Sequence, residues 1–562
     1  MAASDLTAQP SLPDEMLNMI CQELGKDRDF GSLYRCAQAS SSVADPALRT
    51  MYQYHEVSPS FLQSDEFDPR LAKADFATKF ADAEQVFRRW TVLWRSIILS
   101  GLDSSRTYKP YCRYLRVLDF RNLMNMLEDV RFQGKMQTAF YAGPMKSVKF
   151  TSHYYKGRQI VDGPQTVNAV GEPLTKATTQ IEEIAGNIGA GVLPSWISRS
   201  PKLESLVLWN GNSLANGAGE AIANHCEAFK SLTIREWRSI PSFDADELFA
   251  TFLNELRADT LQYFELISFN DIAARSFEAL GRHKTLQELK LSNLSQTAIE
   301  NLHHLKGCTN LHTLALEDNL GTVQLEALNN DVFVEVVHWL SSCSKLRDLA
   351  LKKFADGPSL LSQVLSSPNV RLTKLSLEGY QVRLPNSQLF HTALSEQKHL
   401  ESVWLKGNGE DTIPDDLQMM VDGLSNIPHL KELILKDVSD EFQEHHIAQL
   451  AINLPELEEF WTSGDVVSGD LLHALVNLRS LKKLDLYAMT QFTSDEIIDF
   501  LSKLDPEMQR GFNFSLMAAD PNQGNLTDTE QDLIRDYIRS NLDGRFDFVL
   551  WREMDTSDSD SD

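Results

Sequence analysis

A short pattern of apolar positions returns along most of the chain. Its first, fourth and sixth positions are apolar, as in Leu203, Leu206 and Leu208, and copies follow at steps of 24 to 35 residues as far as Leu481. The fourth and sixth positions alternate as in a β-strand, so both point to one side and need to be covered. The clear copies begin at Leu203, Phe229, Leu261, Leu286, Leu311, Leu346, Leu372, Leu400, Leu430, Leu457 and Leu481, with earlier ones at Leu115, Met145 and Ile181.

A stretch with helical spacing follows each strand-like copy. The copy at Leu481, for example, is followed by Ile497, Ile498, Phe500, Leu501 and Leu504. One strand and one helix cannot bury this apolar face alone, but stacked neighbours can. A step of about 28 residues leaves room for a helix in each repeat. The pattern therefore predicts an α/β solenoid with parallel strands on one face and helices on the other.

The residues that precede the strands indicate which type of repeat the chain contains. Cys226, Cys308 and Cys343 each lie three residues before the first position of a copy. A small buried thiol at one structural position explains this spacing. Elsewhere, as in SPKLESL and LPELEEF, a proline stops the helix before the strand begins. These features resemble the cysteine-containing class of leucine-rich repeats, which implies a horseshoe with parallel strands on the concave face and helices on the convex face. We expect this domain over residues 111–551.

The start of the chain has a different pattern. Leu12 and Pro13 open a predicted helix, because proline suits the first helical turn and acidic residues follow it. Apolar residues then recur at helical spacing in two stretches. Three short helices of this size cannot sustain a core of their own and need something to pack against. The apolar residues are Met16, Leu17, Ile20, Cys21 and Leu24, then Phe30, Leu33, Cys36, Ala37, Val43, Ala47, Leu48 and Tyr52.

Over residues 11–55 this order resembles an F-box, the helical module of substrate-recognition subunits. The resemblance implies docking on the Skp-type adaptor of a cullin–RING ubiquitin ligase. It departs from the F-box pattern at Ala37 and at Ser41 and Ser42, where larger apolar and basic or aromatic residues are commoner. The alternative is a helical cap that only closes the end of the solenoid. The adaptor-binding residues would be Leu12, Pro13, Leu17, Ile20, Leu24, Leu33, Cys36, Val43 and Leu48.

The remaining segments differ in composition. Residues 1–10 are predicted to be disordered, and residues 56–110 to form a helical linker whose aromatic face, from Phe76 to Leu99, packs against both neighbours. Residues 151–179 are rich in Gly, Pro and Thr, which predicts a flexible insertion. A capped helix from Thr527 to Asn541 leads into a strand around Phe548 that closes the array. Residues 552–562 form an acidic tail that we expect to be disordered.

In leucine-rich repeats, the positions between and after the apolar first, fourth and sixth positions face the concave surface. Trp404 and Trp461 share the fifth position with one repeat between them, about 10 Å apart, and lysines occupy nearby positions. Aromatic anchors beside cations combine apolar burial with charge steering, so an acidic or phosphorylated peptide could bind near residues 345–490. Alternatively, the lysines pair with Glu378, Glu432 and Asp485 on a solvated face. The candidate substrate-binding residues are Trp209, Lys352, Trp404, Lys406, Lys436, Trp461, Lys483 and Tyr487.

Charge and composition exclude several classes of function. The chain has 53 Lys and Arg against 79 Asp and Glu, a net charge of −26, which opposes binding to nucleic acid or anionic membranes. No segment offers about 18 consecutive apolar residues for a membrane span. The six cysteines are scattered without a CxxC pair, as expected for reduced thiols in the cytoplasm or nucleus. No phosphate-binding loop, nucleophile elbow or zinc-peptidase motif occurs, so we expect no enzyme activity, cofactor or metal.

Three functions remain as hypotheses. The first is a substrate-recognition adaptor whose partners are a Skp-type adaptor, a cullin scaffold and a protein substrate. The second is a leucine-rich-repeat scaffold for protein–protein interaction, with a helical cap and no ligase role. The third is a GTPase-activating protein, since some of these are also leucine-rich-repeat arrays, but no isolated loop arginine supports it.

Overall fold

The computed structural model describes residues 12–55, 76–129, 131–132, 134–148, 152–155, 158–241, 243–379, 382, 385–407, 413–439, 441–490, 492–518 and 526–550. The N-terminal residues 1–10 and the acidic tail 552–562, both expected to be disordered, lie outside this part. The chain divides into two compact units, Met1–Phe264 and Glu265–Asp562.

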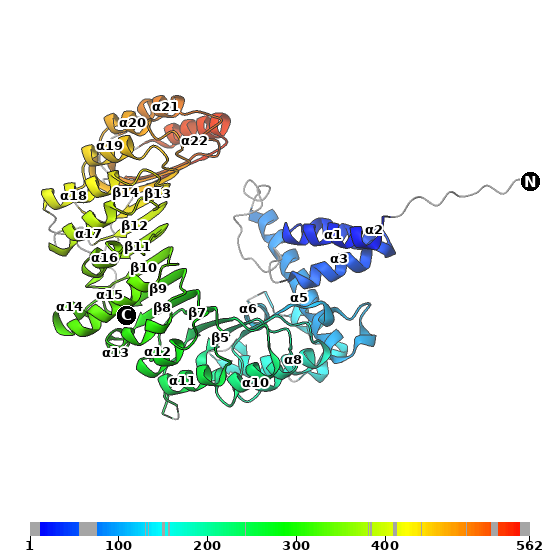
Figure 1. The fold of residues 1–562 in the computed structure, drawn as a ribbon. Helices are drawn as coiled ribbons and strands as arrows, with labels where there is room; N and C mark the ends of the chain where they lie inside the picture. Colours follow the sequence, from blue (N-terminus) through cyan, green and yellow to red (C-terminus); the bar gives the residue numbers. More distant parts are fainter. Residues whose placement is uncertain are drawn as a thin grey trace, which may run out of the picture. The chain divides into compact units, whose positions relative to one another are not determined.

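The first unit begins with three helices, α1 (Asp14–Lys26), α2 (Phe30–Ala39) and α3 (Ser41–Gln53) (Figure 1). Their shared core consists of Cys21, Leu33 and Ala47, one residue from each helix, and none is more than 1% exposed. Asp29 caps α2, because its carboxylate accepts the Ser32 backbone N–H at 2.9 Å. The predicted helical module therefore forms, with a small core.

The long helix α5 (Phe76–Leu102) joins this module to the repeats. Trp90 and Trp94 of α5 both donate their indole N–H to Oδ1 of Asn122, at 2.8 and 2.7 Å. Asn122 lies on α6 (Phe120–Glu128), next to the first strand of the repeats. Trp94 and Ile97 are fully buried. In the part whose side chains the structure describes, from Phe87 onward, the aromatic face of α5 is thus packed core, as expected for a connector.

The strands of the repeats follow one another in chain order. Fifteen parallel strands, β1 and β4 to β17, form one sheet that alternates with helices. The strands of the first unit are β1 (Val117–Asp119), β4 (Glu183–Gly186), β5 (Ser205–Asn210) and β6 (Ser231–Glu236), and β7 (Tyr263–Leu266) spans the division between the units. Its other helices are α7 (Lys135–Phe140), α8 (Gly163–Ala177), α9 (Leu193–Ser198), α10 (Ala218–His225) and α11 (Ala245–Glu255), with short 3-10 turns η2 (Ser104–Arg106), η3 (Tyr111–Tyr114), η4 (Gly143–Ser147) and η5 (Gly211–Leu214).

The second unit repeats the same strand–helix unit, and helices α15 to α20 line one side of strands β9 to β14 (Figure 1). Its strands are β8 (Glu288–Leu294), β9 (Thr313–Asp318), β10 (Asp348–Lys352), β11 (Lys374–Glu378), β12 (Ser402–Lys406), β13 (Glu432–Lys436), β14 (Glu459–Val467), β15 (Lys483–Thr490), β16 (Asn513–Ala518) and β17 (Arg545–Leu550). Its helices are α12 (Ala274–Leu280), α13 (Gln296–Ile299), α14 (Leu325–Leu328), α15 (Asn330–Ser342), α16 (Gly357–Leu365), α17 (Pro385–Ser395), α18 (Pro414–Ser425), α19 (Glu444–Asn453), α20 (Gly469–Leu475), α21 (Ser494–Ser502) and α22 (Asp528–Leu542), with the 3-10 turn η6 (Leu302–Gly307).

The register of the sheet confirms the repeat pattern. Strand pairing aligns the fourth position of one copy with the fourth position of the next, as with Leu314 and Leu349. The sixth positions, such as Leu316 and Leu351, are aligned in the same way and are equally buried. In the second unit the fourth-position row runs through Leu289, Leu314, Leu349, Leu375, Val403, Leu433, Phe460, Leu484, Phe514 and Phe546.

In several repeats, the residue three positions before the copy ties that repeat to the one before it. The thiols of Cys226 and Cys308 donate to the Ser200 and Leu280 carbonyls, at 3.4 and 3.5 Å. Burial raises the pKa of Cys226, Cys308 and Cys343 to about 12, which suits thiols that stay protonated. Gln397 occupies the same place before Leu400 and donates to the Leu365 carbonyl at 2.9 Å. The structural role expected for the cysteines is confirmed, and a buried glutamine shares it.

Two sequence predictions near the first strand were wrong. The copy expected at Met145 forms no strand, because Gly143, with φ of 63°, and Pro144 start the turn η4, and β1 pairs directly with β4. The insertion expected at residues 151–179 contains the hairpin β2 (Ser152–Tyr155) and β3 (Arg158–Val161), followed by α8. Helix α8 buries Val167, Val170 and Leu174, so these residues belong to the core.

The end of the array matches its prediction. Thr527 caps α22 with a reciprocal pair of hydrogen bonds to Glu530, in which each backbone N–H finds a side-chain oxygen. The chain then forms β17, which pairs with β16 through Phe546 and Phe548. The predicted closing helix and strand are therefore confirmed.

Candidate functional site

The outer side of α1 carries exposed apolar side chains. Leu12, Met16, Met19 and Ile20 expose 49%, 48%, 68% and 46% of their surface, respectively. Met16 lies three and four residues from Met19 and Ile20, which places these three on one side of α1, and Leu12 lies just before the helix, which begins at Asp14 after Pro13. We call these four residues the α1 face. Contiguous exposed apolar groups of this kind mark surfaces that contact another macromolecule.

The residues expected to bind the adaptor separate into two sets. Leu12, Pro13 and Ile20 are exposed at the surface, and Leu17 is half-buried beside them. The other expected residues support the module from inside: Leu33 is fully buried, Leu24, Cys36 and Val43 pack against its core, and Leu48 is half-buried. Met16 and Met19 belong to the α1 face but were not among the expected residues. The helical spacing between Met16 and Ile20 was the signal that could have found Met16.

The module is held in the first unit through α3 rather than α1. The ring of Tyr52 on α3 stacks on Tyr111 at 4.3 Å, and its hydroxyl lies 2.7 Å from Ser96 Oγ on α5. Burial raises the pKa of Tyr52, so the hydroxyl stays protonated. Lys109 also pairs with Asp45 of α3 at 2.7 Å. These contacts leave the α1 face on a different side of the module.

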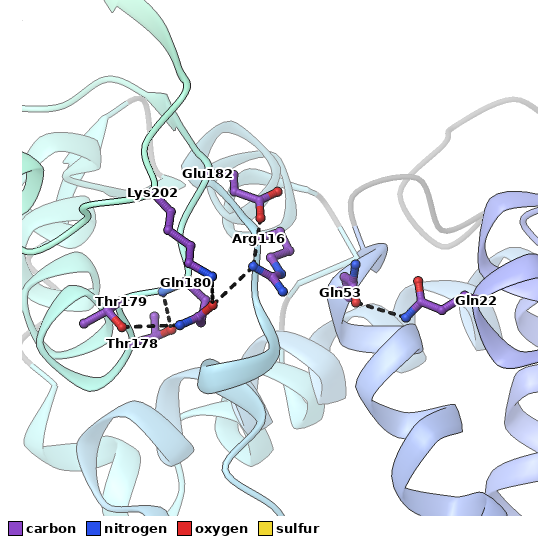
Figure 2. Close-up of polar contacts among 8 residues, drawn as sticks. All are labelled: Gln22, Gln53, Arg116, Thr178, Thr179, Gln180, Glu182 and Lys202. Atoms are coloured by element: carbon purple, nitrogen blue, oxygen red, sulfur yellow. Dashed lines mark hydrogen bonds and ion pairs between the residues drawn. The ribbon is translucent and has the colours of Figure 1, made fainter. Parts of the chain in front are cut away.

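Polar contacts fix α1 against α3. Figure 2 shows Gln22 of α1 donating to Gln53 of α3, at 3.2 Å. Gln22 also accepts a hydrogen bond from the Tyr54 hydroxyl at 3.2 Å. Gly25 allows this close approach, because a Cβ at this position would lie 2.6 Å from Thr50 Cγ2. The orientation of the α1 face within the module is therefore set by side chains of α1 and α3.

Ion pairs join the starts of successive strands. In the first unit, Arg116 pairs with Glu182 at 2.8 Å, and Lys202 donates to Gln180 at 2.7 Å (Figure 2). In the second unit the same position is occupied by the pairs Lys431–Glu401 and Lys482–Glu458, at 2.8 and 2.6 Å. Exposed pairs of this kind contribute little to stability because water and salt screen them. They link repeats and use lysines that would otherwise be free to bind a partner.

Aromatic residues gather on the strand face of the second unit that lies opposite the helices. Trp404, Ile434 and Trp461 align across β12, β13 and β14. The Trp461 ring stacks on Tyr487 with centroids 5.5 Å apart, and the Lys436 ammonium lies 5.8 Å from the Trp461 centroid. Lys436 and Tyr487 are exposed, and the other three residues are half-buried. We call these five residues the aromatic strip.

The neighbouring lysines are partly matched by carboxylates. Lys406 pairs with Glu378 at 2.7 Å. Lys483 lies 3.5 Å from Asp485 and 3.6 Å from Glu459. This part of the face is therefore not strongly cationic, as the alternative of a solvated, paired surface predicted.

Other residues expected on the substrate-binding face take no part in these ion pairs. Glu432 accepts a hydrogen bond from the Ser402 hydroxyl at 2.7 Å and does not pair with Lys436. Within the described residues, no carboxylate lies within ion-pair distance of Lys436 or Lys352. Trp209 belongs to the first unit, where the Arg235 guanidinium lies 3.8 Å from its ring centroid. The structure thus brings together Trp404, Lys406, Lys436, Trp461, Lys483 and Tyr487 on four adjacent strands.

His446, which follows His445 on α19, has a structural role. His446 Nδ1 accepts the Gln443 backbone N–H at 3.0 Å and so caps α19, and burial lowers its pKa to about 4. The described part of the chain contains no group of three or more side chains placed to hold a metal ion. Within the same residues, none of the helices combines the length and apolar character that a membrane span requires.

The strand ladder and its leucine positions define a leucine-rich-repeat fold. Among solved structures, the chain is similar to TLR13 in its complex with ssRNA13, with 15% identity and a TM-score of 0.33 over 63% of this chain and 55% of that one. It is also similar to the plant peptide hormone receptor RGFR1 in complex with RGF2, with 16% identity and a TM-score of 0.30 over 60% and 53% of the two chains. A third similar structure is the complex of Rad7 and Elc1 in yeast, with 14% identity and a TM-score of 0.33 over 62% and 78%.

The chain thus spans little more than half the length of the first two proteins. Comparison with models of known protein families finds no match, and comparison with characterised proteins finds none.

Proposed function

We propose that this chain is a substrate-recognition subunit of a cullin–RING ubiquitin ligase. Its helical module docks on a Skp-type adaptor through the α1 face, and its repeats bind a protein substrate. The ligase partners supply the thioester and RING chemistry. The contribution of this chain is to hold the substrate near them, which raises the effective concentration of the reacting groups.

The α1 face is the observation that carries this proposal. Four large apolar side chains, each between 46% and 68% exposed, lie on α1 or just before it, in a module whose core is already closed by Cys21, Leu33 and Ala47. Exposing these side chains to water is unfavourable, and a partner surface that covers them regains part of this free energy. They also fall in the segment that resembles the adaptor-binding part of an F-box.

The alternative function, in which the module is only a helical cap without a ligase role, explains fewer of the observed contacts and exposed residues. The stacking of Tyr52 on Tyr111 and the ion pair of Asp45 with Lys109 explain how α3 is held against its neighbours. These contacts are what a cap requires. They give no reason for the exposed apolar residues of α1, because a helix that only closed a solenoid would carry polar residues on its outer side.

The aromatic strip supports the second half of the proposal. Tyr and Trp are enriched among the residues that dominate binding energy at protein interfaces. Trp461 and Tyr487 form a stacked pair, and Lys436 beside them has no carboxylate partner in the described part of the chain. We therefore place a substrate segment on the strip, with an acidic or phosphorylated side chain at Lys436.

Affinity capture of the full chain with a Skp-type adaptor tests the proposal. The double variant Met16→Asp/Ile20→Asp places two charges on the α1 face and should abolish co-purification of the adaptor. Leu328→Asp is the matched control, because Leu328 lies on α14 and is 81% exposed. Retention of the adaptor by the double variant would show that the α1 face does not bind it.

Capture of substrate is measured separately, with the proteasome blocked. The charge-reversal variants Lys406→Glu and Lys436→Glu distinguish the contributions of the paired and the unpaired lysine. Lys436→Glu should lose the substrate while the melting temperature stays unchanged, since its side chain is exposed. If both variants retain the substrate, the aromatic strip is not its binding site.

A further inference from the structure

A cavity of about 570 Å³ lies in the first unit between α5 and α7. It shares no residue with the α1 face or with the aromatic strip. From α5 it is lined by Arg88, Val92 and Arg95, which recur at spacings of four and three residues and so lie on one side of the helix. Lys135 of α7 and Arg131, just before α7, face them across the cavity. We call this cavity the α5–α7 groove.

The charge of the groove is positive in a strongly acidic chain. Arg88, Arg95, Arg131 and Lys135 line it, and among the lining residues that the structure describes Glu84 is the acidic one. The net charge of the whole chain is −26. A local cationic surface on such a chain is a distinct feature, because the net negative charge of the chain opposes approach of an anion elsewhere unless local cations attract it.

Two of the four cations are held in place by hydrogen bonds. Arg131 binds Asp129 through Nε and Nη2, at 2.8 and 2.7 Å, so its charge is matched. Arg95 donates to the Phe140 and Ala142 carbonyls, both at 3.1 Å. Carbonyls are neutral, so the charge of Arg95 is not neutralised. The two hydrogen bonds hold its guanidinium against the C-terminal end of α7.

The other two cations are available to a ligand. Arg88 and Lys135 are exposed, and neither has a carboxylate within ion-pair distance among the residues that the structure describes. Between them, Val92 is 62% exposed, while Met136 is half-buried. The groove therefore combines an apolar strip with cations whose charge is not neutralised.

We infer that the α5–α7 groove binds a short acidic segment of a partner protein. Carboxylates of the segment pair with Arg88, Arg95 and Lys135, and an apolar side chain of the segment covers Val92. A nucleic acid fits less well, because Phe140 is only 2% exposed and so offers no ring surface for base stacking. The overall charge of the chain also opposes a long polyanion. This inference is independent of adaptor docking by α1.

Fluorescence anisotropy tests the groove with the full chain and one defined probe. The probe is a short fluorescein-labelled peptide in which Asp and Glu residues flank one Leu and one Phe. We expect saturable binding that weakens as salt is added, since exposed ion pairs are screened. Arg88→Glu/Lys135→Glu should weaken binding by about tenfold or more. The matched control is Arg89→Glu, a charge reversal on the same helix at an exposed residue outside the groove lining, which should change binding by less than about twofold.

Three outcomes would overturn the inference. The first is the absence of saturable binding of the peptide to the wild-type chain. The second is equal binding by the double variant and by Arg89→Glu, which would place the peptide elsewhere. The third is binding of an oligothymidylate of the same length as tightly as the peptide, with loss of both in the double variant, which would assign the groove to nucleic acid. Thermal melting of each variant checks that the fold is intact.

Discussion

Truncation of the α1 face should weaken adaptor binding without destabilising the fold. Met16 and Ile20 expose 48% and 46% of their surface, so about half of each side chain is available to a partner. Fully burying a side chain of this size contributes about 1.5–3 kcal/mol, and covering the exposed half contributes roughly 1 kcal/mol. Met16→Ala/Ile20→Ala should therefore cost about 2 kcal/mol of binding free energy, or roughly 30-fold in Kd.

Leu33→Ala in the same module should instead destabilise the fold. Leu33 is fully buried between Cys21 and Ala47, so its truncation leaves a cavity in the core. Substitutions of this kind cost about 2–5 kcal/mol of folding free energy. The variant should lower the melting temperature of the first unit, and any loss of adaptor binding would follow from unfolding of the module.

Two measurements on the same purified chains separate these effects. Titration calorimetry with a purified Skp-type adaptor gives the Kd, and differential scanning fluorimetry gives the melting temperature. Leu328→Ala is the control for truncation of an exposed apolar residue. The reasoning is refuted if Met16→Ala/Ile20→Ala keeps the wild-type Kd, or if it lowers the melting temperature as much as Leu33→Ala does.

Three further predictions concern other parts of the chain. Gln397→Ala removes a buried amide that bonds three backbone groups, so urea unfolding should show a loss of about 1–3 kcal/mol, and an unchanged midpoint would contradict this role. Burial lowers the pKa of His55 to about 4, below its unfolded value near 6.5, so the folded state excludes a proton that the unfolded state binds. The stability of the first unit should therefore fall by up to about 3 kcal/mol as pH drops from about 6.5 to 4, and His55→Gln should flatten this dependence in fluorescence-monitored unfolding. Trp461→Ala removes the stacking partner of Tyr487 and should weaken substrate capture by about tenfold or more, whereas retention of wild-type capture would exclude the aromatic strip.

The repeat could be read from the sequence because its periods are local. Alternation at the fourth and sixth positions, as in Leu314 and Leu316, is the spacing of a strand, and the helical spacing that follows is equally local. Once each strand is recognised, stacking of the repeats aligns the same position of neighbouring copies, as Leu314 and Leu349 show. The capped helix at Thr527 was predictable for the same reason, since both partners of the cap lie within one turn.

The segment 163–177 shows where local composition misled the prediction. Val167, Val170 and Leu174 have helical spacing, but Gly163, Pro164 and Pro173 suggested a loop. Pro164 lies in the first turn of α8, where proline is favourable, and burial of the apolar residues outweighs the cost of Pro173 inside the helix. This balance depends on packing and could not be read from composition.

What the sequence alone determined is most of the strands and helices of the repeats, because these depend on spacing along the chain. The tertiary structure decided which side of each element remains exposed. Cys21 and Ile20 are adjacent in the same apolar stripe, yet packing of α1 on its neighbours buries one and leaves the other 46% exposed. Lys406 meets Glu378 only because β11 and β12 pair in register. Contacts between residues that are distant in sequence arise from folding, and the aromatic strip consists of such contacts.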